Sequence, residues 1–310
     1  MHDLALRYLA ELLIDAINSR FEGSFHLTEA LPTPGTFVAA DGDRRLAVYV
    51  APLWEHEAAS DWQQRLDTAA LRFEGALPGR YLLWVPPGAA VPVEEQAASD
   101  FVRRVGDAGA QLAPGERTEV TFPVSVRMAK MREEGGYASV TGGLSRWWTR
   151  ITENVNGTYT VDSTTVHRIT HDGPAREELW KRIGQIALGV EVGQVATFDV
   201  DEAWTLQRLS DGAGDGFALI GAPPNVDPDD GVLVRRTARR RLQAANEAFA
   251  SVDAGVRAAG LLGAYEYADV ETASGTIKAL DPSLFARTEI VSLLTDGDVK
   301  HVFLPRMLGA

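Results

Sequence analysis

The residues with the clearest potential for chemistry lie in the segment 142–172, where two adjacent tryptophans, Trp147 and Trp148, stand between Arg146 and Arg150. Aromatic rings beside cations can stack bases and hold phosphates, and large exposed aromatics can equally mark a partner surface. Neighbouring side chains diverge by about 100° on a helix and point to opposite faces on a strand. The two rings therefore cannot enter one core together, and we expect one of them to meet a second domain or a partner.

A second group of cations lies in the C-terminal part of the chain. Its members are Arg235, Arg236, Arg239, Arg240 and Arg241. On a helix, residues four apart share a face, so this group predicts a broad cationic surface for phosphates or an acidic partner. The alternative is a solvated face whose charge is balanced by the aspartates of residues 227–230.

His167 and His171 are four residues apart. They would share a metal on a helix, but on a strand they would lie roughly 13 Å apart. The residues 164–166 are Thr, Thr and Val, which favour a strand. Since no firm third ligand accompanies the pair, we predict two histidines at a strand end and no metal site.

Five side chains near the first predicted hairpin could serve metal-dependent hydrolysis. They are Asp41, Asp43, Glu55, His56 and Glu57. Carboxylate oxygens are the ligands that Mg²⁺ prefers, and an imidazole can act as a base. The alternatives are turn chemistry for the two aspartates and a solvated segment before a helix for the other three.

Other catalytic signatures are missing. The chain has no cysteine, which excludes disulfides, Cys-ligated zinc, thiol nucleophiles and iron–sulfur clusters. It has no glycine-rich phosphate loop ending in Lys-Ser/Thr, no GxGxxG after a strand, no GxSxG and no HExxH. We therefore predict no cofactor, with Mg²⁺ relevant only to a nuclease.

The charge balance restricts the partners. The 310 residues carry 30 Lys and Arg against 43 Asp and Glu, a formal net charge of −13. Nucleic acid and anionic membranes repel such a molecule, so any nucleic-acid site must be a local basic patch. No stretch approaches the roughly 18 apolar residues of a membrane span, and the N-terminus does not read as a signal peptide. We expect a cytoplasmic location and no membrane partner.

The periodicity of apolar residues predicts an α/β, or more broadly α+β, fold. Helices are expected over residues 2–21, 60–77, 93–112, 144–155, 174–188 and from 229 or 230 to about 259. Strands are expected over residues 24–29, 36–40, 45–53, 81–85, 118–128, 159–169, 195–206, 217–220, 289–294 and 299–304. For the strand over 159–169, a break at Asp162-Ser163 is the alternative. Turns at Asp41-Gly42-Asp43 and Asp296-Gly297 predict two hairpins, and residues 133–143 read as a polar loop or hairpin.

Two breaks divide the chain into three predicted domains. Pro114-Gly115 ends an α/β scaffold domain, residues 1–114. Residues 115–222 form a second, β-rich α+β domain that carries the Trp/Arg segment. Residues 223–310 contain a Pro- and Asp-rich linker, a long helix and a C-terminal hairpin.

The order predicted over residues 3–85 is helix, weak strand, strand, strand, helix, strand. It resembles the mixed-sheet core of the restriction-endonuclease-like, or PD-(D/E)xK, nuclease superfamily, over roughly a quarter of the chain. In that family an Asp near the second core strand and a Glu-x-Lys on the third hold a divalent metal beside the scissile phosphate.

The resemblance is one of pattern, and the metal motif departs from the family. Asp41 or Asp43 matches the first carboxylate, but the next strand, residues 46–50, has neither Glu nor Lys. Glu55 and Glu57 lie just beyond it, with His56 as a base. The resemblance therefore implies a scaffold with a degenerate active site.

We expect a non-enzymatic subunit of a larger assembly that binds a protein partner, nucleic acid, or both. The binding residues would be Arg146, Trp147, Trp148 and Arg150 with the arginine face of the long helix. The resemblance alone suggests bacterial nucleic-acid handling or phage defence. The alternatives are a metal-dependent nuclease with rearranged carboxylates and a self-associating structural protein, a homo-oligomer.

The nuclease alternative predicts that Mg²⁺ or Mn²⁺ supports cleavage of DNA or RNA and that Asp43→Ala abolishes it, because the metal would lose a carboxylate ligand. Gel assays on single- and double-stranded DNA and RNA measure this. Intact substrates under both metals would contradict the nuclease interpretation.

Overall fold

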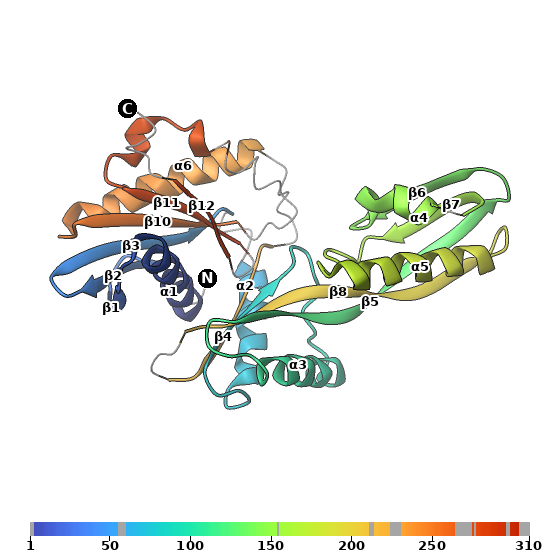
Figure 1. Ribbon diagram of the computed structural model, residues 1–310, viewed down its shortest axis with the longest axis horizontal. Coiled ribbons are helices and arrows are strands. Elements are labelled where there is room, and N and C mark those ends of the chain that lie inside the picture. The colour runs from blue at the N-terminus through green and yellow to red at the C-terminus, as the bar shows by residue number, and fades with distance from the viewer. Residues whose placement is uncertain are drawn as a thin grey trace.

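The computed structural model describes residues 3–54, 60–153, 155–210, 214–223, 231–263, 275, 277–295 and 298–303. Within these ranges the chain has an α+β fold built on two mixed six-stranded sheets (Figure 1), which confirms the predicted class. No helix in this part of the chain combines the length and apolar character that a membrane span requires.

The first sheet, called sheet A, combines strands from the N-terminal and C-terminal parts of the chain. Its order is β1-β2-β3-β10-β11-β12. The strands are β1 (His26–Ala30), β2 (Thr36–Asp41), β3 (Arg44–Pro52), β10 (Val256–Leu262), β11 (Ile290–Thr295) and β12 (Asp298–Phe303). The centre β3-β10-β11 is parallel, and β1-β2-β3 and β11-β12 pair antiparallel. Both predicted hairpins, β2-β3 and β11-β12, are confirmed.

Helices cover both faces of sheet A. The α1 helix (Asp3–Phe21) lies on one face and α6 (Gly231–Ala248) on the other (Figure 1). The expected helix up to about residue 259 is wrong, because α6 ends at Ala248 and the strand β10 follows. Both faces of this parallel strand are covered, so its apolar residues run almost without interruption, as they also do in a buried helix.

The second sheet, sheet B, has the order β6-β7-β5-β8-β4-β9. Its strands are β4 (Arg80–Val85), β5 (Arg117–Arg132), β6 (Gly136–Gly142), β7 (Gly157–Ser163), β8 (Val195–Arg208) and β9 (Gly216–Gly221). Its helices are α2 (Ser60–Ala70), α3 (Glu95–Gly109), α4 (Trp148–Thr152) and α5 (Gly173–Gly189), with the short 3-10 turns η2 (Leu71–Phe73) and η3 (Ser145–Trp147).

The sequence predicts most of these elements but misassigns one of them. Residues 133–143, expected to be a loop or hairpin, contain β6, which pairs parallel with β7 and not with β5. The strand expected over residues 159–169 ends at Ser163, where a break was the alternative. The strand at residues 81–85 is present as β4, but it pairs with β8 and β9 in sheet B and not with β3. Strands of the predicted first domain are thus divided between the two sheets.

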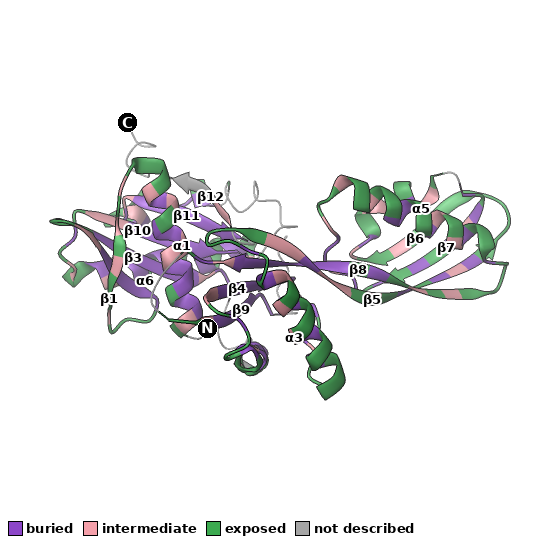
Figure 2. Cartoon of the chain, turned by 60° about the horizontal axis from the view of Figure 1, so that its bottom comes forward, coloured by how far each residue is buried: buried purple, intermediate pink, exposed green. Residues whose placement is uncertain are grey.

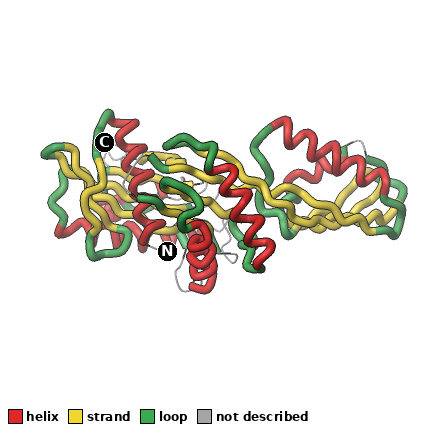
Figure 3. Tube along the Cα trace, turned by 90° about the horizontal axis from the view of Figure 1, so that it is seen from below, coloured by secondary structure: helices red, strands yellow, loops and turns green. Residues whose placement is uncertain are grey.

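The long β5-β8 ribbon gives the molecule its shape. The two strands pair antiparallel from Arg117–Gln207 to Ala129–Val195. One end pairs with β4 and is covered by α3, while the other pairs with β7 and is covered by α5. The ribbon carries its outer half, residues 123–201, away from the remaining body, and we call this half the tip lobe (Figures 2 and 3).

The α1 helix connects the two sheets. Its buried side chains share one core with sheet A and with Leu82, Trp84 and Ile220 of β4 and β9. An ion pair of Arg80 with Glu11 links β4 to α1 at the same interface. The body is therefore one packed unit, because α1 joins sheet A and the β4-β9 end of sheet B in a single apolar core.

We expect Gly260→Ala to destabilise the body. A Cβ at Gly260 in β10 would lie 2.8 Å from Leu294, 2.9 Å from Val50 and 3.0 Å from Leu13. Overpacking of this kind costs about 1–3 kcal/mol of unfolding free energy, measured by urea titration.

Gly106→Ala is the matched control, since outside the backbone of its own helix α3 no atom of the described residues lies within 4 Å of the added Cβ. This change should stabilise the protein by roughly 0.5–1 kcal/mol. Equal effects of the two variants would contradict the packing described for β10.

Candidate functional site

The tip lobe places Trp148 and Tyr137 together on its surface. Trp148 opens α4, and Tyr137 lies on the outer strand β6. Their ring centroids are 6.5 Å apart, and the two residues are 44% and 57% exposed. We call this pair the aromatic corner. Side chains of this size usually become exposed together where a surface receives a partner.

Trp147 points elsewhere, as the sequence predicts. It is half-buried and its ring lies 5.5 Å from that of Trp180 on α5. The guanidinium of Arg146 lies 5.4 Å from the Trp147 ring centroid, and that of Arg176 lies 5.9 Å away. Trp147 therefore joins α4 to α5, and Trp148 is the ring left at the surface.

Arg150 is bound by two carboxylates of its own lobe. It donates to Glu153 at 2.8 Å and forms a second ion pair with Glu177 of α5. The hydrogen bond to Glu153 and the charge of Glu177 raise the pKa of the guanidinium. An arginine balanced in this way contributes little to an anion site, so a phosphate-binding role for Arg150 stays a prediction without geometric support.

A second apolar surface lies at the far end of the ribbon. Met131 is the second-last residue of β5 there, and Lys130 and Ala129 beside it pair with Val192 and Val195. Met131, Val192 and Val195 are all exposed, and we call them the distal apolar group. Among the described residues ten large apolar side chains are exposed, and six of them belong to the tip lobe.

The tip lobe is almost neutral in a strongly acidic chain. Its residues 123–201 include nine Lys and Arg and ten Asp and Glu, whereas the whole chain has a net charge of −13. The lobe thus combines exposed apolar side chains with balanced charge. A surface of this kind is better suited to binding a protein than to binding the phosphates of a nucleic acid.

The predicted arginine face divides into two parts. Arg235, Arg236, Arg239 and Arg240 are exposed on α6. Arg241 faces the body and donates to the backbone oxygens of Pro52 and Trp54, both at 3.0 Å. Arg241 therefore fixes the end of β3 against α6, while a nucleic-acid or partner role for the four exposed arginines stays a prediction.

Asp41, at the end of β2, is engaged in the hairpin. It pairs with Arg44 and accepts a 3.3 Å hydrogen bond from the backbone N–H of Ser24. The turn itself consists of Gly42, whose φ is +58°, and Asp43. These contacts favour turn chemistry for Asp41. The other nuclease candidates, Glu55, His56 and Glu57, lie outside the described residues.

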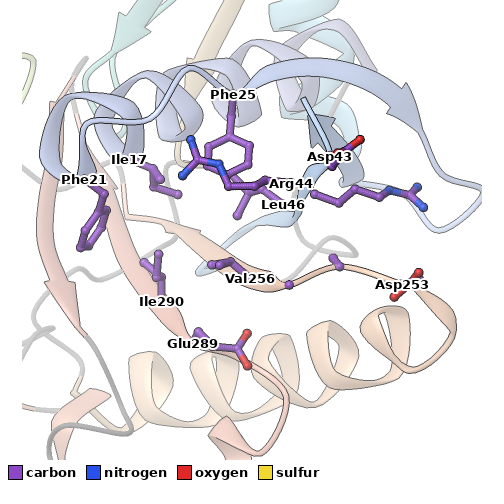
Figure 4. Close-up of a pocket in the computed structure, with 13 residues that line it drawn as sticks. Ile17, Phe21, Phe25, Asp43, Arg44, Leu46, Asp253, Val256, Glu289 and Ile290 are labelled. Carbon is purple, nitrogen blue, oxygen red and sulfur yellow. The ribbon is translucent and has the colours of Figure 1, made fainter. Parts of the chain in front are cut away.

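Asp43 lines a cavity of about 560 Å³ at the end of sheet A (Figure 4). Its apolar lining consists of Ile17, Phe21, Phe25, Leu46, Ala254, Val256 and Ile290. Asp253 and Glu289 also line it, but Glu289 accepts a 2.8 Å hydrogen bond from the backbone N–H of Arg257. The described residues hold no group of three or more His, Cys, Asp or Glu placed to bind a metal. The cavity is suited to the apolar body of a small molecule.

A buried polar network that was not predicted from the sequence lies halfway along the β5-β8 ribbon. Glu202 of β8 is only 2% exposed and accepts a 2.7 Å hydrogen bond from the backbone N–H of His167. Its carboxylate also lies 2.9 Å from Nδ1 of His167 and accepts a 3.0 Å hydrogen bond from Nε1 of Trp204. His167 is thus held by a carboxylate.

This network joins the body to the tip lobe. A Cβ on Gly88, in the loop after β4, would lie 3.0 Å from the His167 ring, so the two loops are in close contact. Arg168 donates to Thr205 of β8, and Glu119 of β5 accepts from Thr170 at 2.5 Å and from the backbone N–H of His171 at 3.0 Å. One sequence signal for this site is Glu202 itself. It is an acidic residue at the start of the part of β8 that is buried, residues 202–207.

Comparisons with known proteins add no relationship. No protein-family model matches the chain, and neither a curated protein nor a solved structure is significantly similar to it. The functional interpretation therefore depends on the geometry described above.

We expect Glu202→Ala to weaken the attachment of the tip lobe. The change leaves buried N–H donors of His167 and Trp204 without an acceptor, which costs on the order of 3 kcal/mol. Hydrogen exchange of residues 165–171 should accelerate, as measured by mass spectrometry.

Glu178→Ala on the exposed side of α5 is the control, because the Glu178 side chain is exposed and forms a surface ion pair with Lys181 at 3.8 Å. It should change neither stability nor exchange measurably. Similar exchange in both variants would contradict a structural role for Glu202.

Proposed function

We propose that this chain is a non-enzymatic subunit that binds a protein partner through its tip lobe. The observation that supports the proposal is the concentration of exposed apolar side chains on this lobe, which holds six of the ten found among the described residues. Interfaces place aromatic and methionine side chains at their centre and avoid uncompensated charge there. The aromatic corner and the distal apolar group have this composition.

Charge favours a protein over nucleic acid at this surface. Nucleic-acid affinity comes largely from cations that neutralise phosphates. On the tip lobe Arg150 is paired with Glu153 and Glu177, and acidic residues slightly outnumber basic ones. Contact of nucleic acid with the exposed arginines of α6 remains a separate proposal.

The body would serve as the scaffold. A likeness to restriction-endonuclease-like proteins over residues 3–85 remains a separate proposal. The strand expected to complete that core, β4, pairs with β8 and β9 in sheet B and not with β3. A metal-dependent nuclease, bacterial nucleic-acid handling and phage defence draw no support from the described side chains.

A photo-crosslinking amino acid at position 148 tests the proposed function. With p-benzoylphenylalanine in place of Trp148, irradiation of cells that naturally contain the protein should give a discrete protein adduct, because the ring would lie inside the interface. Western blotting and mass spectrometry identify the adduct. Trp148→Ala should weaken binding of that partner at least about tenfold, as a central aromatic residue does.

Leu71 provides the matched control, since it is also a large exposed apolar residue, 61% exposed, but lies on the body. The same photo-reactive group at position 71 should give no comparable adduct. A signal at position 148 that equals the one at position 71, or adducts with nucleic acid only, would refute a protein-binding tip lobe.

A further inference from the structure

The outer strand of the tip lobe, β6, is an unprotected sheet edge. It pairs with β7 on one side and with no strand of the described residues on the other. Its seven residues, Gly136–Gly142, read Gly-Tyr-Ala-Ser-Val-Thr-Gly and include no charge and no proline. Its pairing with β7 runs through all seven residues without a bulge. Soluble proteins normally use charge, proline or a bulge to stop such an edge from accepting another strand.

The other edge strands carry such protection. In sheet A, β1 contains Glu29 and an irregular register between Leu27 and Glu29. The opposite edge, β12, begins with Asp298, and its pairing with β11 is irregular between Val291 and Leu293.

In sheet B the strand β9 lies against α2, where Trp62 donates to the backbone oxygen of Gly221 at 3.0 Å. The free side of β8 in the tip lobe carries Asp199 and Asp201, and Arg182 donates to the Asp199 backbone oxygen at 2.8 Å. Among the described edge strands, β6 therefore combines mostly exposed residues with no charge and no bulge, whereas β9 is buried; α4 and η3 lie next to β6.

We propose that β6 is a self-association site at which a second copy of this chain adds its own β6 antiparallel, joining the two tip sheets across a two-fold axis. This inference rests on the proposed function, because it identifies a second copy of the chain as the protein that binds the tip lobe at β6. An isologous contact requires a surface that is complementary to itself. A charge-free edge meets that requirement, since no like charges face each other.

The register follows from symmetry. Full overlap of the seven residues places Ser139 opposite Ser139 of the second copy, Tyr137 opposite Thr141, and Ala138 opposite Val140. Aromatic and β-branched residues are favourable cross-strand partners. Tyr137, Ser139 and Thr141 are exposed in the single chain, whereas Ala138 packs into the core of the lobe. The pairing thus keeps each residue on its present face of the sheet.

The position of the edge permits this approach. The tip lobe stands away from sheet A at the end of the ribbon (Figure 1). The aromatic corner lies beside β6 and would be covered in part by the second copy, because Tyr137 belongs to the paired strand. The distal apolar group is formed by β5, β8 and the segment before β8, so it would stay open to a different protein.

A single cysteine tests the proposed pairing, because the chain has no cysteine of its own. In Ser139→Cys the two thiols would lie opposite each other, with Cα atoms about 4.5–5.5 Å apart, within the range that a disulfide spans. Mild oxidation of the full-length protein should convert most of it to a covalent dimer on non-reducing gels.

Thr160→Cys is the matched control. Thr160 pairs with Ser139 but belongs to the inner strand β7, and it is exposed on the same sheet face. In the proposed dimer the two copies of residue 160 would be three strand spacings, about 14 Å, apart, too far for a disulfide. Equal cross-linking of both variants overturns the proposal.

A second measurement does not depend on oxidation. Light scattering with size-exclusion chromatography should show a dimer for the unmodified protein and for Thr160→Lys, and a monomer for Ser139→Lys, in which two ammonium groups would face each other. Circular dichroism establishes that both variants are folded. A monomeric unmodified protein at concentrations up to about 100 μM, where even weak self-association is visible, overturns the proposal.

The outcomes separate this inference from the proposed function. Adducts from position 148 with a different protein, together with no cross-link at position 139, reject self-pairing and leave the partner-binding function standing. A cross-link at position 139 with position-148 adducts containing two copies of the chain supports both. No adduct and no cross-link rejects both.

Discussion

Pairing between β5 and β8 is the interaction on which the rest of the molecule depends. The two strands run antiparallel from the core of the body to the core of the tip lobe, a distance of about 40 Å at 3.4 Å per residue. Apolar residues bury the ribbon against α3 at one end and α5 at the other. In between, no further strand of the described residues pairs with β5 or β8. There Ile169 forms an isolated bridge with Glu202, and the Glu202–His167 network supplies further contacts. The tip lobe is thus held by backbone hydrogen bonds and a buried carboxylate rather than by a continuous apolar core.

The body makes this projection possible because it is tied together by α1. Residues of α1 pack against sheet A and against β4 and β9 of sheet B in one core. A helix buried by two sheets cannot shift without disturbing both, so the base of the ribbon has a fixed support. The exposed apolar surface lies on the tip lobe, whereas Asp41 and Asp43, the described carboxylates of the nuclease prediction, lie on the body. Of those, Asp41 is occupied by Arg44 and Ser24.

The charge of the chain is distributed unequally between the body and the tip lobe. The tip lobe is nearly neutral, so the excess acidity of the chain lies on the body. Net charge of one sign keeps protein surfaces apart, whereas a neutral lobe with exposed aromatic and aliphatic side chains permits close contact. The uncharged edge of β6 belongs to the same lobe, which places both proposed contacts where repulsion is weakest.

Local patterns predicted much of the secondary structure. The 3.6-residue periodicity of α1 and α5, the turns of the β2-β3 and β11-β12 hairpins, and the alternation in β5 and β8 are all encoded by neighbouring residues. The divergence of Trp147 and Trp148 was also predictable, because adjacent side chains on a helical segment point in different directions. Two strands were misjudged for opposite reasons. The run in β10 is apolar enough for a buried helix, and β6 is polar and Gly-bounded enough for a loop.

What the sequence by itself determined is the α+β class, the positions of most helices and strands, the acidic surface and the absence of thiol chemistry. Tertiary structure alone decided that β3 pairs with β10, two hundred residues further along the chain, and that β4 joins the other sheet. It also decided that Glu202 meets His167 and that β6 forms an open edge. The physical reason is that strand pairing and buried polar contacts join residues distant in sequence. Their partners are selected by the packing of whole elements, which no local periodicity records.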